Sequence, residues 1–95
     1  MVKRKKEEEQ VYFDTFGGAV DAAKEYTEKR GYEIKEEDWW REIATGGKYT
    51  RARPGVGETH RFTIGLIKNG KLQKKALHIQ VYGMKNKYEL NYYIN

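Results

Sequence analysis

The sequence predicts an α+β fold in which two N-terminal helices pack on a three-stranded antiparallel β-meander. Apolar residues in the first half of the chain recur at helical spacing, whereas those in the last third alternate with polar residues. The dipeptide Asn69-Gly70 stands between two alternating segments, as is typical of a β-hairpin turn. A chain of 95 residues suits one domain, which we expect over residues 10–95 after a flexible charged tail at residues 1–9.

The first helix is expected over residues 15–30, with Asp14 as its N-cap and Gly31 as its stop. Residues 11–13 before this helix and residues 32–34 after it have the character of short extended segments or connectors. The apolar stripe of the helix consists of Phe16, Ala19, Val20, Ala23 and Tyr26.

A second, shorter helix is expected to begin at the acidic residues 36–38 and to end at Gly46-Gly47. It contains Trp39 and Trp40, and adjacent helical residues point about 100° apart. Both indole rings therefore cannot be fully buried in so small a core. We expect one of them in the core and the other at the sheet edge or in solvent.

The strands of the meander follow from their turns. Asn69-Gly70 supplies the two residues of positive φ that a type I′ turn requires, which sets Phe62 opposite Leu77. A second turn around Met84-Lys85 sets Val81 opposite Tyr88. Because side chains alternate between the faces of a sheet, one face is assigned to the core. Its residues are Phe62, Ile64, Leu66, Leu77, Ile79, Val81, Tyr88, Leu90, Tyr92 and Ile94.

Charge is distributed unevenly along the chain, whose net charge is +5. Residues 7–42 hold twelve acids and five bases, whereas residues 43–95 hold two acids and ten Lys or Arg. The β half should therefore carry a positive field, which attracts polyanions. The opposite face of the meander is expected to bear Arg61, Thr63, Ile67, Ala76, His78, Gln80, Tyr82, Lys87, Glu89, Asn91 and Tyr93.

This mixture of side chains suits a nucleic-acid partner, DNA or RNA. Tyr rings can stack on bases, Gln and Asn amides can pair with base edges, and cations can hold phosphates. The Gly-rich loop at residues 45–58 adds cations that could follow a phosphate backbone. The predicted nucleic-acid-binding residues are Lys48, Arg51, Arg53, Arg61, Lys75, His78, Gln80, Tyr82 and Tyr93. A plainly solvated sheet face and loop remain the alternative.

Enzymatic chemistry has little support in the sequence, and we expect no catalytic residues, no metal and no cofactor. The chain has no Cys, so thiolate zinc sites and thiol nucleophiles are excluded. The two His residues, His60 and His78, are expected on opposite faces of the sheet. The tripeptide at residues 33–35 matches the Glu-x-Lys of one nuclease family but lies in a connector, without an acid on a preceding strand.

Two other functions remain open. The acidic helical face with Trp39 or Trp40 could anchor a protein partner, because exposed Trp side chains are frequent binding hot spots. An edge of the sheet could also pair with a second copy of the chain, and the oligomeric state is left undecided.

The segments at residues 68–83 and 87–94, K-N-G-K-L-Q-K-K-A-L-H-I-Q-V-Y-G and K-Y-E-L-N-Y-Y-I, resemble small uncharacterised accessory proteins of tailed bacteriophages. The resemblance covers the C-terminal half and carries no active site. It implies a viral protein that acts in the host cytoplasm, by binding nucleic acid or by inhibiting a host or defence protein. A cytoplasmic location also fits the absence of Cys and of a secretory signal, and no apolar run is long enough to predict a membrane partner.

Overall fold

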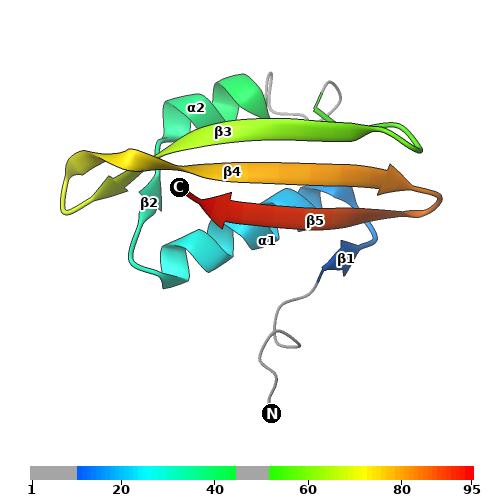
Figure 1. Ribbon diagram of the computed structural model, residues 1–95, viewed down its shortest axis with the longest axis horizontal. Helices are drawn as coiled ribbons and strands as arrows, with labels where there is room; N and C mark the ends of the chain where they lie inside the picture. Colours follow the sequence, from blue (N-terminus) through cyan, green and yellow to red (C-terminus); the bar gives the residue numbers. More distant parts are fainter. Residues whose placement is uncertain (1–10, 45–51) are drawn as a thin grey trace, which may run out of the picture.

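The computed structural model of the chain describes residues 11–44 and 52–95, and these residues form an α+β fold (Figure 1). The predicted class is confirmed, but the described residues form a five-stranded sheet rather than a three-stranded meander, in the order β1-β5-β4-β3-β2. Both helices lie on one side of this sheet, behind it in Figure 1. The elements are β1 (Tyr12–Phe13), α1 (Phe16–Lys29), β2 (Glu33–Ile34), α2 (Glu36–Glu42), β3 (Thr59–Lys68), β4 (Lys71–Met84) and β5 (Lys87–Ile94).

The two additional strands are short edge strands at opposite sides of the meander. β1 pairs with β5, where the Leu90 N–H donates to the Val11 carbonyl at 2.8 Å. β2 pairs with β3, and just beyond it the Lys35 N–H donates to the Gly65 carbonyl at 2.8 Å. Segments of two residues have no periodicity of their own, so their strand character depends on the partner strand.

Helix α1 begins one residue later than predicted, because Thr15 rather than Asp14 is the N-cap. The Thr15 hydroxyl accepts a hydrogen bond from the Gly18 N–H at 3.0 Å. The helix ends before Gly31, which adopts a φ of 90° as expected of a glycine stop. Four of the five predicted apolar positions are buried, and the fifth buried position is Thr27 rather than Tyr26. The Thr27 hydroxyl is satisfied there, since it donates to the Ala23 carbonyl at 2.8 Å.

The β3–β4 hairpin turns at the predicted dipeptide, where Asn69 and Gly70 have φ values of 54° and 75°. Its register differs from the prediction, because β4 gains two residues between Leu72, which pairs with Ile67, and Ala76, which pairs with Gly65. This bulge sets Phe62 opposite Ile79 instead of Leu77. A shift of two residues keeps every side chain on its predicted face.

The β4–β5 turn lies one residue later than predicted, at Lys85-Asn86. Asn86 has a φ of 67°, a conformation that Asn tolerates better than most residues. Val81 is consequently opposite Leu90 rather than Tyr88, again with the face unchanged.

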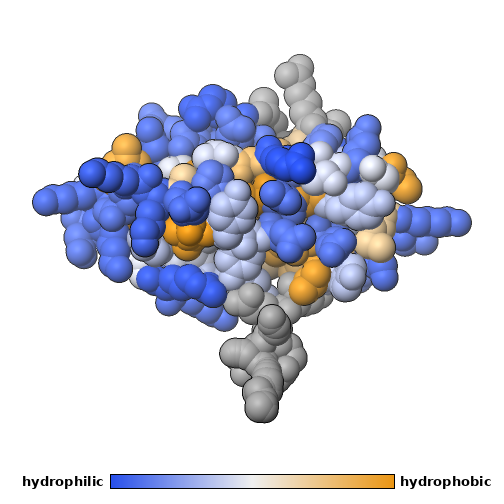
Figure 2. Space-filling model, in the orientation of Figure 1, coloured by the Kyte–Doolittle hydropathy of each residue, from blue (hydrophilic) through white to orange (hydrophobic). Residues whose placement is uncertain are grey.

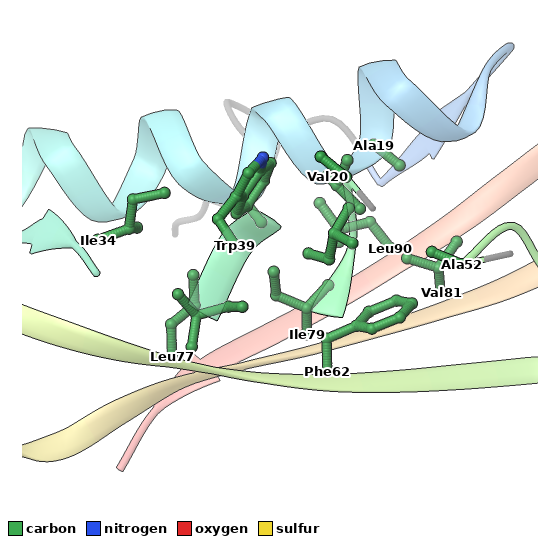
Figure 3. Close-up of a cluster of buried hydrophobic side chains, with 14 of the residues drawn as sticks. Ala19, Val20, Ile34, Trp39, Ala52, Phe62, Leu77, Ile79, Val81 and Leu90 are labelled. Atoms are coloured by element: carbon green, nitrogen blue, oxygen red, sulfur yellow. The ribbon is translucent and has the colours of Figure 1, made fainter. Parts of the chain in front are cut away.

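The core lies between the helices and the predicted face of the sheet (Figure 3). Seven of the ten predicted sheet positions are buried, and Tyr88, Tyr92 and Ile94 are partly buried against them. Trp39 projects into the core and is 5% exposed, whereas Trp40 is 52% exposed, so the expected division between the two Trp is confirmed. Neither described helix is long and apolar enough to cross a membrane.

Residues 52–58, the crossing segment, close one end of this core. The Gly57 N–H donates to the Gly83 carbonyl at 2.8 Å, and the Gly83 N–H donates to the Glu58 carbonyl at 2.9 Å. Gly83 follows Ile79 and Val81 in the set that faces the helices, and the Gly55 carbonyl oxygen occupies the space where a Gly83 side chain would stand. The crossing segment therefore lies on the helix side of the sheet.

Candidate nucleic-acid interface

The face of β3, β4 and β5 that points away from the helices, the open face, carries the predicted sheet residues in cross-strand rows. In one row Arg61 lies opposite Gln80, which lies opposite Asn91. In the next, Thr63 lies opposite His78, which lies opposite Tyr93. Figure 2 views the molecule from this side, and its surface is largely hydrophilic. The alternation in the sequence thus placed these side chains correctly on one face.

His78 and Tyr93 form a stacked pair in the middle of this face. Their ring centroids are 4.7 Å apart and their planes are inclined by 20°. The His78 Nε2 lies 3.3 Å from the Asn95 main-chain oxygen, and its Nδ1 lies 3.4 Å from the Thr63 hydroxyl oxygen. A main-chain oxygen only accepts, so Nε2 is the donor toward Asn95, and the Thr63 hydroxyl can donate to Nδ1 or accept from it. These contacts fix the position of the His78 ring in the pair, while Tyr93 remains 48% exposed.

A third row contains Tyr82 and the one acid of the open face, Glu89. Tyr82 is 39% exposed and lies opposite Glu89, which in turn lies opposite Tyr12 of β1. The Lys87 ammonium lies 4.9 Å from the centroid of the Tyr12 ring. Both predicted stacking residues, Tyr82 and Tyr93, are therefore accessible, with their rings on neighbouring strands.

Within residues 11–44 and 52–95, the cations of the β half are not paired with the acids of the helical half. Of the ten in residues 43–95, Lys48 and Arg51 lie outside the described residues, and the other eight are all exposed. None of the eight forms an ion pair within residues 11–44 and 52–95. They are Arg53, Arg61, Lys68, Lys71, Lys74, Lys75, Lys85 and Lys87.

These cations are concentrated at the two ends of the sheet rather than across its face. Four of them lie at the β3–β4 turn or in the bulge, namely Lys68, Lys71, Lys74 and Lys75, and two lie at the β4–β5 turn, Lys85 and Lys87. Arg61 lies in the row between that of Tyr82 and that of His78. Arg53 was predicted in the basic loop; it belongs to the crossing segment, which lies on the helix side of the sheet, and is not a residue of the open face.

The acidic helix α2 is fixed to the sheet by Asp38, between β3 and Arg41. The Asp38 Oδ2 accepts the Gly65 N–H at 2.8 Å, and its Oδ1 accepts from Arg41 Nη2 at 2.7 Å. The pKa of this carboxyl is lowered, mainly by the hydrogen bond from Gly65 and to a lesser extent by Arg41. Partial burial acts in the opposite direction and does not cancel this effect. Trp40 of the same helix is the exposed member of the predicted protein-binding pair, whereas Trp39 is a core residue.

The two His residues lie on opposite faces, as predicted. The His60 Nδ1 donates to the Ala52 carbonyl at 2.7 Å on the helix side, far from the His78 row. In the described part of the chain, no three His, Asp or Glu side chains converge on a point where a metal ion could sit. The Glu-x-Lys tripeptide spans β2 and the start of α2, where Lys35 pairs with Glu37 at 3.9 Å.

Comparisons of the chain with protein-family models, with curated proteins and with solved structures find no match.

Proposed function

We propose that this protein binds single-stranded nucleic acid across the open face of its sheet. The observation that carries the proposal is a sheet face free of helices, on which two half-exposed Tyr rings are flanked by an Arg and by side-chain amides. Flat rings on a rigid sheet stack on bases, and bases are accessible for stacking only where they are unpaired. A duplex hides its base faces, so the rings favour a single strand.

Electrostatics supports the same partner. The eight described cations of the β half are exposed and have no acidic partner among the described residues. Their field at both ends of the sheet would attract and extend a phosphate backbone along the strands, with Arg61 contacting it in the middle. In this arrangement Tyr82 and Tyr93 stack on bases, and Gln80 hydrogen-bonds to base edges.

A test is the affinity for a labelled oligothymidylate of about twelve nucleotides, measured by fluorescence anisotropy. We expect the affinity to fall steeply as salt rises from about 50 to about 200 mM, because counterions are released from the strand on binding. Arg61→Gln should make the salt dependence shallower by about 0.7 in log–log slope, as expected for one phosphate contact on a single strand. An affinity that does not change with salt would exclude phosphate recognition.

A second candidate function is protein binding through Trp40, favoured by its 52% exposure on a helix that begins with three acids. Trp40→Ala separates the two functions. It should leave oligonucleotide affinity unchanged if the open face is the binding surface, and a loss of oligonucleotide binding in that variant would argue against the sheet.

A further inference from the structure

A pocket of about 470 Å³ opens between the connection from α1 to β2, the β4 bulge and β5. This volume is within the range of small-ligand sites, roughly 300–1,000 Å³. It was not expected from the sequence, because the bulge brings part of its wall into place. The pocket is lined by Arg30, Tyr32, Lys75, Tyr92, Tyr93 and Ile94.

The lining is chemically one-sided. Among the residues that the structure describes, it contains two cations, three Tyr and one aliphatic residue, with no acid. Lys75 is exposed and forms no ion pair or hydrogen bond with another described residue. Such a lining suits a ligand that combines an anionic group with a flat aromatic one, since ammonium and guanidinium groups bind phosphate and Tyr rings stack on planar rings.

The pocket lies at the C-terminal end of α1, whose carbonyl groups would repel an anion. Arg30 offsets this effect, because its Nη1 donates to the Tyr26 carbonyl at 2.8 Å. The same guanidinium lies 5.7 Å from the centroid of the Tyr92 ring. Arg30 is therefore held across the pocket wall, with its charge near the helix end.

Tyr93 connects the pocket with the open face. Its ring stacks on His78 in the Thr63–His78–Tyr93 row, and the same residue lines the pocket. A nucleic-acid strand that lies along the β-strands of the open face and stacks one base on Tyr93 is therefore next to the pocket, because Tyr93 belongs to both.

From these observations we infer that the pocket holds one nucleotide of the bound strand, with its phosphate at Lys75 and Arg30 and its base against the Tyr93 ring. The inference rests on the proposed function and deepens it, because it makes this pocket a site for a free nucleoside monophosphate as well. The bulge in β4 then has a function, since it brings Lys75 to the pocket.

Calorimetric titration with adenosine monophosphate and with inorganic phosphate tests the inference. The monophosphate should bind, compete with the oligothymidylate, and bind more tightly than phosphate alone, because the base adds stacking on Tyr93. Lys75→Gln should weaken monophosphate binding about five- to tenfold, as expected for loss of one charge-assisted contact. Lys71→Gln removes the same charge from the same hairpin, outside the pocket, and should change the affinity for the monophosphate less than about twofold.

The outcomes separate the inference from the proposed function. If the oligothymidylate binds but the monophosphate does not, or if Lys75→Gln and Lys71→Gln have equal effects, the pocket assignment is wrong and the open face stands. Equal affinities for inorganic phosphate and monophosphate would also overturn it, because the base would then contribute nothing. If neither the oligonucleotide nor the monophosphate binds, the proposed function fails and the inference fails with it.

Discussion

The imidazole of His78 stacks on the ring of Tyr93 at a centroid distance of 4.7 Å, and this pair forms a fixed aromatic surface in the middle of the open face. A ring that is already held costs little conformational entropy when a base stacks on it.

Tyr93→Ala should therefore weaken oligonucleotide binding by about 1–3 kcal/mol, the usual contribution of one stacked base. Tyr93→Phe keeps the ring and removes the hydroxyl, so its affinity should stay close to that of the unaltered protein. Anisotropy titrations of both variants check this. Equal losses in the two variants would mean that the hydroxyl, rather than stacking, provides the contact.

Glu89 is the one acid on the open face and should repel a phosphate backbone. We expect Glu89→Gln to tighten oligonucleotide binding about two- to fivefold at low salt. Glu25→Gln, which makes the same charge change on the exposed side of α1, should alter the affinity less than about 1.5-fold because of distance and screening. Anisotropy titrations of the two variants side by side check this. An equal gain in oligonucleotide affinity in both variants would contradict the location of the interface.

Gly83 is expected to be intolerant of a side chain. A β-carbon there would collide with the Gly55 carbonyl oxygen and would lie 3.1 Å from the Pro54 carbonyl oxygen. Gly83→Ala should lower the free energy of unfolding by about 2–3 kcal/mol, because the crossing segment must move. The matched control is Gly55→Ala, whose new carbon meets the flexible Glu58 carboxylate at 3.1 Å and should cost less than about 1 kcal/mol in urea denaturation. A mild effect of Gly83→Ala would show that the crossing segment is not packed there.

Asp38 should make stability depend on pH in the acid range. Its pKa is lowered in the folded protein, so its stabilising effect is complete above the unfolded value of about 3.9 and is lost as the pH falls through the folded value. Asp38→Asn should reduce the free energy of unfolding by about 1–2 kcal/mol at neutral pH, and the difference from the unaltered protein should disappear in strong acid. Glu37→Gln, which breaks only a surface contact with Lys35, should have a smaller effect at either pH. If the free energy of unfolding of Asp38→Asn differs from that of the unaltered protein by the same amount at all pH values, the carboxylate does not have this role.

The sequence predicted which face of the sheet each side chain occupies better than it predicted the cross-strand residue pairs. Alternation placed Ile64, Leu77 and Ile79 in the core and His78 on the open face, because a strand has only two faces. The β3–β4 pairs were wrong by two residues because a bulge of two residues leaves the alternation unchanged, and the β4–β5 pairs were wrong because the turn lies one residue later. Its local support, hydrogen bonds from the Gln73 amide to the Lys71 carbonyl at 2.9 Å and to the Lys68 carbonyl at 3.5 Å, has no clear pattern in the sequence.

Features that depend on tertiary contacts could not be predicted from the sequence either. The two-residue strands β1 and β2 exist because β5 and β3 offer partners, and the pocket exists because Arg30, Lys75 and Tyr93 converge from distant positions. One signal was available in the sequence. Asn86 is of a residue type that accepts the left-handed conformation, so the second turn could have been predicted one position later. Lys48 and Arg51 stay predictions, because they lie outside the described residues.

The most direct test of the open face as the nucleic-acid interface is a two-dimensional amide NMR titration of the labelled protein with oligothymidylate. Saturable shifts should concentrate at Arg61, His78, Gln80, Tyr82 and Tyr93 and leave Trp40 and the outer side of α1 unchanged. Shifts that centre on Trp40 and α2 instead, or no saturable shifts at low salt, would contradict the account.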